Sequence, residues 1–385
     1  MIIPFRSPRC SLMSYVLNDT QKGIKDMVAE FARRDILPKA EELDKNRHYP
    51  QDAIKGIAAQ KMTALLLPPE AGGPGLDTIS YVIILEELAK AHGSLGLVLE
   101  AHNSLALYPL YALGSQKQKD EVLTPLANGD ALATMALMEE GAGHNFGSWT
   151  TTAKKDGSGY VINGKKILVI SGAVAEKVLV GTNGPEGVSI FILNKGSITK
   201  IEPGYVVGMN SAGLATMEFT NVKVGPDALL GTFGGARDVL VNASGLHAMG
   251  IAAVAVGVNQ ASLESARDYA NMRVQFNETL AHFPAIQWMM TDMLACAEGA
   301  RLLTHKAAAL YDDKQDFIFP ARLAKMVAGD GAMQSAVKCS QVHGGLGFTK
   351  EAVAERLMRD AKVLQILAGT SEAHKDFLAK KILGL

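Results

Sequence analysis

The sequence is poor in cysteine, and its few cysteines suggest neither a disulfide nor a metal site. Only Cys10, Cys296 and Cys339 occur among the 385 residues, odd in number and far apart. Such spacing fits neither a disulfide framework nor a zinc motif, so we expect no bound metal. Free thiols are typical of a reducing compartment, and the sequence therefore predicts a cytoplasmic protein.

An excess of charge of one sign is also missing. The 38 basic and 39 acidic residues nearly cancel, and no basic run with interleaved aromatic residues occurs. Proteins that bind nucleic acid or anionic membranes usually carry such a basic patch. No apolar run reaches the roughly 18 residues that a membrane-spanning helix requires. We therefore expect neither nucleic acid nor a membrane as a partner.

Residues 1–12 contain two arginines and no acidic residue. A short targeting segment is one interpretation, but the stretch lacks a continuous apolar core and a small-residue cleavage site. We prefer the alternative, an extension without fixed structure ahead of a second possible start at Met13.

The chain does contain enough apolar residues for a large core, at 48%. Its length suits two or three packed units. Three patterns follow one another: helical spacing of apolar residues over 14–130, short β-rich runs divided by Gly, Asn and Pro over 131–232, and helical spacing again over 233–385. These ranges are the three domains that the sequence predicts.

Two features of the helical regions can be predicted in more detail. Asn18 or Asp19 is suited to cap the first helix. A stretch without proline, residues 243–276, predicts a helix about 50 Å long. It is more apolar than an exposed helix should be, so we expect it to pack against other helices or another subunit.

Several motifs run in register over almost the whole chain, from Leu17 to Leu383. In order they read LLLPPEAGGPGLD, MEEGAGHNFGSWTTTAKKDGSGYVINGKK, ARDYANMRVQF, QVHGGLGF and LMRDAKVLQILAGTSE. This series resembles the acyl-CoA dehydrogenase family. The resemblance implies an α+β fold with an N-terminal helical domain, a middle antiparallel β domain and a C-terminal four-helix bundle. It also implies that FAD is the cofactor and that an acyl-CoA thioester is oxidised to its α,β-enoyl form.

For the tail of FAD, the resemblance assigns a set of binding residues. Arg273 resembles the arginine that binds the FAD diphosphate of a neighbouring subunit, and a guanidinium suits phosphate oxygens. Phe276 is expected beside the adenosine. The other matching positions are Gln341, Gly344, Gly345, Thr370 and Glu372. Taken alone, Arg273 could equally be a solvated helix end. Pro284 replaces a glutamine that touches FAD in many relatives, which puts that contact in doubt.

At the flavin ring the sequence departs from the family. Relatives have two threonines and a tryptophan where this chain has Met138, Ile170 and Leu168. Backbone groups of Leu137, Met138, Ile170 and Ser171 are still expected to bond the ring edge. Two interpretations stay open: drift at positions where the backbone does most of the binding, or a β domain that no longer supports redox chemistry.

On the substrate side the family pattern is partly kept. His144 and Asn145 replace a serine and an aspartate that lie beside CoA in relatives, which keeps polarity but changes charge. Gly369 retains the family's glycine at a substrate-binding position.

The main departure is the catalytic base. The family's usual glutamate, in the motif Y-E-G-T, is replaced here by Ala368, which cannot accept a proton. Some relatives carry the glutamate on the long C-terminal helix instead, and that position is His247, followed by Ala248. An imidazole is a plausible general base at neutral pH. The alternative is a histidine that only fills the cavity. Glu100 is a weaker candidate, since a solvent-facing carboxylate at a helix end is the simpler expectation.

Three functions remain open on these residues. The first is an FAD-dependent acyl-CoA dehydrogenase with an unusual base, which passes electrons to an electron-transfer flavoprotein. The second is a non-catalytic subunit that binds the FAD tail in a heteromeric dehydrogenase. The third is non-redox acyl-CoA chemistry on the same fold. The resemblance also implies a homotetramer, or a heterotetramer with a homologous subunit.

Overall fold

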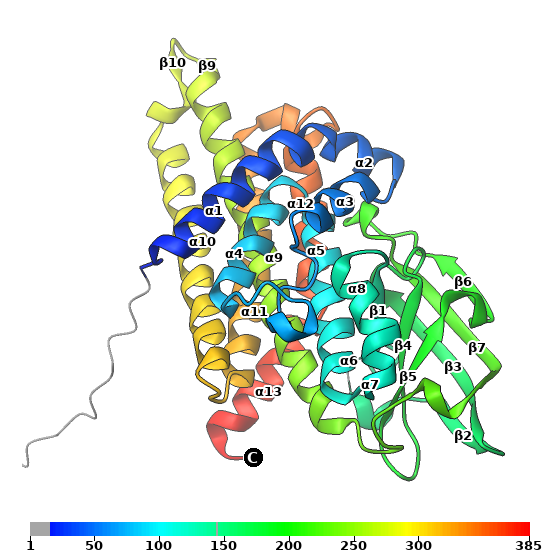
Figure 1. Cartoon of the computed structure of the whole chain (residues 1–385). Helices are drawn as coiled ribbons and strands as arrows, with labels where there is room; N and C mark the ends of the chain where they lie inside the picture. The colour runs from blue at the N-terminus through cyan, green and yellow to red at the C-terminus, as the bar shows by residue number, and fades with distance from the viewer. Residues whose placement is uncertain (1–15, 144) are drawn as a thin grey trace, which may run out of the picture.

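The computed structural model describes residues 16–143 and 145–385. The predictions for residues 1–12, Cys10 and His144 therefore lie outside the described residues. The chain forms a group of helices, then two β sheets, then a second group of helices (Figure 1). This order confirms the α+β architecture.

The N-terminal part consists of short helices. They are α1 (Asp19–Phe31), α2 (Ala40–Asn46), α3 (Gln51–Ala59), α4 (Thr78–Ala91), α5 (Gly93–Ala101), η4 (His102–Leu107), α6 (Tyr108–Leu113), α7 (Gln116–Gln118) and α8 (Thr124–Asn128), with shorter turns η1 (Ala32–Ile36), η2 (Leu37–Lys39), η3 (Pro69–Ala71) and η5 (Lys119–Leu123). Asn18 is the cap of α1: its side chain accepts a hydrogen bond from the backbone N–H of Gln21 at 2.9 Å, and the Gln21 side chain accepts one from the Asn18 N–H at 3.0 Å.

The middle part contains two four-stranded sheets. One is antiparallel, in the order β2 (Thr152–Asp156), β3 (Gly159–Val169), β7 (Ala215–Val224), β6 (Lys200–Pro203). The other has the order β1 (Ala133–Ala136), β4 (Lys177–Thr182), β5 (Ser189–Asn194), β8 (Leu229–Leu230). Here β1 pairs with β4 in parallel, unlike the antiparallel pairs expected from the sequence. A parallel pair cannot be joined by a tight hairpin, and β2 and β3 lie in the intervening chain.

The C-terminal part is a bundle of α9 (Arg237–Met272), α10 (Pro284–Asp312), α11 (Ile318–Val342) and α12 (Val353–Ile366), followed by α13 (Ser371–Leu383). The long helix α9 begins and ends earlier than the predicted 243–276. It packs on α4, α10, α11 and α12. By length and composition it could span a membrane, but 78% of its most apolar window is buried inside the protein. Such burial is typical of a core helix.

The helix α9 ends because the chain turns into a hairpin of β9 (Val274–Gln275) and β10 (Glu278–Thr279). Phe276 and Asn277 form its turn at φ 53° and 64°. A tight hairpin turn needs positive φ, a conformation that a phenylalanine rarely adopts. The hairpin projects beyond the helices at one end of the molecule (Figure 1).

His102 joins the N-terminal helices to the first strand. Its Nδ1 accepts a hydrogen bond from the Ala133 N–H at 3.2 Å, and its Nε2 lies 3.3 Å from the Leu126 carbonyl, which suits an Nε2–H donor. Burial lowers the pKa of His102 to about 4, so this side chain is neutral at pH 7. The contact fixes the strand that leads to Leu137 and Met138.

Candidate functional site

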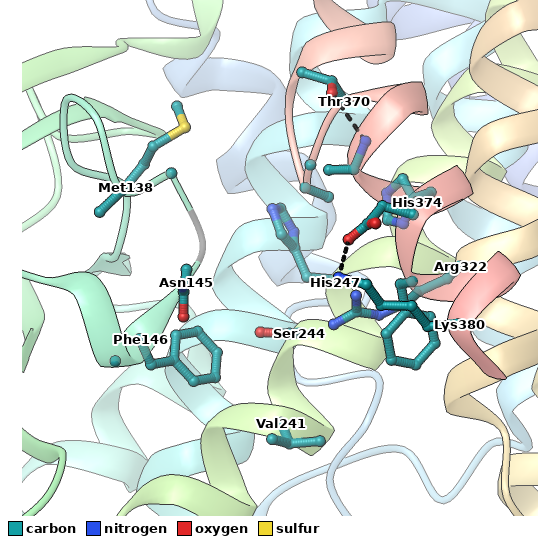
Figure 2. A pocket seen from close by; sticks show the side chains of 18 of the residues that line it. Met138, Asn145, Phe146, Val241, Ser244, His247, Arg322, Thr370, His374 and Lys380 are labelled. Carbon is teal, nitrogen blue, oxygen red and sulfur yellow. Dashed lines mark hydrogen bonds and ion pairs between the residues drawn. The ribbon is translucent and has the colours of Figure 1, made fainter. Parts of the chain in front are cut away.

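A cavity of about 730 Å³ lies between the β domain and the C-terminal helices. Its lining comes from the loop after β1, from one face of α9, and from the end of the chain: Met138, Ala142, Gly143, Asn145, Phe146, Gly147, Arg237, Val241, Ser244, His247, Arg322, Ile366, Ala368, Gly369, Thr370, Ala373, His374, Asp376, Phe377, Lys380, Lys381 and Leu385. Figure 2 shows Met138 and Asn145 on one side, Thr370 and His374 on the other, and His247 between them. This volume is typical of a small-molecule site.

A second, much smaller cavity of about 20 Å³ brings the predicted ring-edge residues together with the predicted base. Its wall includes Leu137, Met138 and Ile170 from the β domain. His247 and Ala368 line this cavity as well as the large one. Leu168, which replaces the tryptophan of relatives, lines the small cavity as well. Six residues singled out in the sequence therefore converge on one place, although the helix α9 and the loop before α13 are far apart in the chain.

His247 is held by a buried carboxylate. Its Nδ1 lies 2.7 Å from Oε2 of Glu100, and the two side chains are 3% and 0% exposed. The expectation that Glu100 faces solvent at a helix end was therefore wrong. The helix α5 is covered on all sides, since each of its residues is buried. Sequence reasoning missed this pair because an isolated glutamate in an apolar helix gives no sign of its partner.

Ala368 lies in a sharp turn between α12 and α13. Ala368 and Gly369 have φ of 59° and 98°, in the left-handed region. Lys325, which is fully buried, donates hydrogen bonds to the carbonyls of Gln365 and Gly369 and so supports this turn. Burial lowers the pKa of Lys325 to about 8. The sequence analysis missed Lys325, although a lysine within the apolar segment ARLAKMVAG is a visible signal.

His374 is a second imidazole at the cavity that the sequence analysis missed. It is buried, and its Nε2 lies 3.3 Å from where a Cβ on Gly369 would stand. Burial, together with the positive charges of Lys325 and Arg322, lowers the pKa of His374 to about 3. It is therefore neutral at physiological pH and packs beneath the turn that carries Ala368.

The backbone at the ring edge is held by a buried ion pair. Burial opposes the ionisation of Glu139, but Lys166, 2.8 Å away, and hydrogen bonds from Thr151 and Thr150 hold the pKa of Glu139 down to about 2. Lys166 also donates to the carbonyl of Leu137 at 3.1 Å, and the carbonyl of Met138 accepts from the backbone N–H of Ile167 at 2.8 Å. These two carbonyls are thus already used within the protein.

The predicted FAD-tail residues do not all reach the cavity. Thr370 lines it and caps α13, where its hydroxyl accepts from the Ala373 N–H at 3.3 Å. Glu372 is exposed and does not line it. The others lie on exposed surface elsewhere: Arg273, Phe276, Gln341, Gly344 and Gly345. His247 lies in α9 and Arg273 directly follows the last residue of that helix, so the two are roughly 39 Å apart at 1.5 Å per residue.

The exposed positions suit the phosphates of a dinucleotide. Arg273 forms no ion pair with any other residue between 16 and 385 that the structure describes, and Phe276 is 87% exposed in its strained turn. A Cβ at Gly344 or Gly345 would meet nothing within 4 Å, so the backbone there is open to a ligand. The chemistry of these tail positions, an arginine beside open glycine backbone, fits the diphosphate of FAD.

The cavity has a cationic side. Arg322 stacks on Phe377 at 4.0 Å and forms no ion pair within the described part of the chain. Arg237 and Lys381 also line the cavity, whereas Lys380 is paired with Asp376 at 2.9 Å. Among residues 16–143 and 145–385, no three His, Cys, Asp or Glu side chains are placed to hold a metal ion.

Comparisons with known proteins agree with this architecture. Family models match three segments: the acyl-CoA dehydrogenase N-terminal domain over 18–130, the middle domain over 134–222 and the C-terminal domain over 238–383. The short-chain specific acyl-CoA dehydrogenase of Clostridium acetobutylicum is 35% identical over 379 residues, which cover 96% of this chain and 100% of the relative.

Solved structures agree as well. Butyryl-CoA dehydrogenase from Megasphaera elsdenii is 30% identical with a TM-score of 0.92, and the match covers 96% of this chain and 100% of that one. A chain from work on the electron transferring flavoprotein of Acidaminococcus fermentans is 33% identical with a TM-score of 0.92, over 96% and 100% of the two chains. The protein therefore belongs to the acyl-CoA dehydrogenase family, whose members are oxidoreductases that act on the CH–CH bond of acyl-CoA thioesters.

Proposed function

We propose that this protein dehydrogenates a short-chain acyl-CoA thioester at the α and β carbons, with His247 as the base. The observation that carries the proposal is that His247 and Ala368 both line the large cavity and the small one. Met138 also lines both cavities, and Leu137 lines the small one. The position of the usual glutamate and a side chain that can accept a proton thus border the same space. The relatives named for short-chain and butyryl substrates support the choice of acyl chain.

The chemistry can be followed from the residues of this chain. In the proposed step the bond between the α-carbon and its hydrogen breaks, and His247 takes the proton. The electron pair left on the α-carbon forms the α,β double bond as the β-hydrogen leaves with its own pair. FAD, the cofactor of this family, supplies the two-electron acceptor for that hydride when it is bound. Ala368 contributes no proton acceptor and leaves room beside the imidazole.

The cationic side of the cavity supports a CoA ester as the substrate. Arg322 and Lys381 line the cavity, and neither is paired with a carboxylate among the described residues. CoA carries several phosphate charges, and guanidinium and ammonium groups are the usual partners of phosphate. A free short-chain acid would bring only one charge to this surface.

A second candidate function, a non-catalytic subunit, is favoured by three residues. Met138 and Ile170 cannot offer the hydroxyls that relatives offer to the flavin ring, and Ala368 cannot act as a base. The exposed tail positions around Arg273 would still serve a partner's FAD. Activity would then require a homologous subunit that carries the glutamate.

One experiment separates the two. The protein is purified alone, its FAD content is measured, and butyryl-CoA is added without oxygen while the flavin absorbance is followed. Bleaching by the protein alone supports the dehydrogenase. FAD that is never bleached by short-chain acyl-CoA, with activity only after a glutamate-bearing homologue is mixed in, would replace it with the subunit function.

We also propose an electron-transfer flavoprotein as the acceptor and the cytoplasm as the location. The similarity to a chain studied with the flavoprotein of Acidaminococcus fermentans supports the first. Reoxidation of the reduced enzyme by a purified electron-transfer flavoprotein, measured in the absence of oxygen, tests it.

A further inference from the structure

We infer that Glu100 is the positioning residue of His247: the carboxylate holds the imidazole in the Nδ1–H tautomer and leaves Nε2 as the proton acceptor. The inference rests on the proposed function of His247 as a base. It assigns a role to a carboxylate from a different helix, α5, which the family pattern does not require. The evidence is a set of contacts around Glu100.

Both oxygens of Glu100 have partners within the protein. Oε2 lies 2.7 Å from Nδ1 of His247, and Oε1 accepts a hydrogen bond from the hydroxyl of Ser104, one turn along the chain. An ionised carboxylate can only accept hydrogen bonds, so the nitrogen that faces it must carry the proton. In a neutral imidazole this leaves the lone pair on Nε2.

The pair is deeply buried, which strengthens the effect. Glu100 is 0% exposed and His247 is 3% exposed. In a low-dielectric interior a carboxylate without a donor is costly, so Glu100 and His247 constrain each other. When the imidazole accepts a proton it becomes a cation 2.7 Å from the carboxylate, which stabilises that charge. A histidine that merely filled space would not need a charged partner in the core.

The helix packing leaves room for Glu100 only because Gly250 has no side chain. A Cβ at Gly250 would lie 2.9 Å from Oε1 of Glu100 and 2.9 Å from the hydroxyl of Tyr81. Gly250 follows His247 by one turn of α9, so the same helix face presents the imidazole and accommodates its carboxylate.

Tyr81, on α4, is a further neighbour of Glu100. Its hydroxyl is buried and has no hydrogen-bond partner within the described residues. Burial, with a further contribution from the charge of Glu100, raises the pKa of Tyr81 well above its usual value. Tyr81 is therefore neutral, and Glu100 is a charged group that faces the imidazole from the neighbouring helix α5.

The test is Glu100→Gln, which keeps the size of the side chain and removes the charge. A glutamine amide can donate to Nδ1, which would move the imidazole proton to Nε2 and occupy the base. We expect kcat to fall by about 10²–10⁴-fold while KM for butyryl-CoA stays within about threefold, since Glu100 lines neither cavity. The matched control is Glu87→Gln, which removes another buried carboxylate, one that lies 2.8 Å from Lys90 and away from the cavity. It should keep the wild-type kcat.

A second readout does not depend on activity. In protein labelled with ¹⁵N-histidine, the His247 signals, assigned by their loss in His247→Ala, should report Nδ1–H in the wild type and Nε2–H in Glu100→Gln. A wild-type His247 in the Nε2–H form overturns the inference even if Glu100→Gln does not fold. Unchanged kcat and tautomer in Glu100→Gln also overturn it. If the expected tautomers are seen but acyl-CoA never bleaches the flavin of the wild type, the positioning of His247 by Glu100 stands and the proposed function fails.

Discussion

Lys166 Nζ lies 2.8 Å from Glu139 Oε1, and the two side chains are 0% and 2% exposed. Glu139 also accepts hydrogen bonds from the backbone N–H groups of Thr150 and Thr151, while Lys166 donates to the carbonyl of Leu137. The pair thus connects the segment after β1, at the cavity, to the loop at Thr150, eleven residues further along the chain. Two residues of the family motifs have a structural role here, which is to fix the backbone beside the predicted flavin-ring position.

Lys166→Met should therefore destabilise the protein and loosen its FAD. The substitution leaves Glu139 buried without its partner, and breaking a buried ion pair from one side costs about 3–5 kcal/mol. Thermal unfolding and FAD content measure the two effects. Lys165→Met is the matched control, because the neighbouring side chain is 51% exposed and its ion pair with Glu218 is on the surface. Equal melting of the two variants would refute a structural role for the pair.

The role of His247 as the base predicts a specific pattern of rates. His247→Ala should slow flavin bleaching by an acyl-CoA by about 10²–10⁴-fold, the usual cost of losing a positioned base. Ala368→Glu in that background should restore part of the rate. Alanine and glutamate both carry a Cβ, so the substitution at position 368 adds no further strain to the left-handed turn. Bleaching that is equally fast in the wild type and His247→Ala would reduce the histidine to a packing role.

Arg273 is predicted to hold the FAD diphosphate. Arg273→Ala should weaken FAD binding by about 10- to 100-fold, since a hydrogen bond to a charged group contributes about 1.5–3 kcal/mol. FAD titration of the apoprotein followed by fluorescence gives the dissociation constant. Arg267→Ala, in the last turns of the helix that Arg273 follows, is the control, because its guanidinium is exposed and paired with Asp268. Equal affinities in both variants would remove Arg273 from the cofactor site.

Much of the fold could be predicted because the motifs are local and ordered along the chain. The spacing of apolar residues predicted the helical, β and helical parts. The resemblance assigned Leu137, Met138 and Ile170 to the ring edge and Ala368 to the position of the usual base, and these four residues line one small cavity. The parallel pairing of β1 with β4 could not be read in the same way. A short apolar run looks alike in both kinds of sheet, and its partner lies more than forty residues away.

The site was harder to predict because its chemistry depends on contacts between distant helices. Glu100 looks like an ordinary polar residue in sequence, and only the packing of α5 against α9 reveals its burial and its bond to His247. Lys325 reaches the turn of Ala368 across some forty residues for the same reason. Local patterns report which residues share a helix face, not which faces meet.

Four buried histidines predict that the protein loses stability in mild acid. Burial lowers the pKa of His102 and His305 to about 4 and that of His92 and His374 to about 3. In the unfolded chain a histidine has a pKa near 6.5. Between these values the unfolded state binds more protons, so the free energy of unfolding falls as pH drops below about 6.5.

The contribution of one histidine can be measured. Each group contributes a slope of at most about 1.4 kcal/mol per pH unit. His102→Gln keeps one acceptor for Ala133 and one donor for Leu126, so the protein should still fold. The slope of the unfolding free energy against pH, between pH 6.5 and 4, should decrease by the contribution of about one histidine. Urea unfolding at several pH values gives the slope. His282→Gln, at an exposed residue that follows the hairpin, should leave the slope unchanged.

The last prediction concerns assembly, and it follows from the geometry of α9. His247, at the cavity, lies in this helix, and Arg273, at the predicted diphosphate contact, directly follows its last residue; the two are roughly 39 Å apart. That separation exceeds the length of an extended dinucleotide, so one FAD cannot reach both in the same chain. If both residues serve FAD, Arg273 must contact the cofactor of another copy, and the projecting hairpin with Phe276 is the element that would reach it. Light scattering at micromolar concentration should therefore give at least twice the 40.9 kDa of one chain, and the family resemblance favours four chains. A homologous partner subunit would satisfy the same geometry, so the protein is measured alone and after mixing with such a partner. A single-chain mass with FAD bound and bleached by an acyl-CoA would contradict the sharing of the cofactor between subunits.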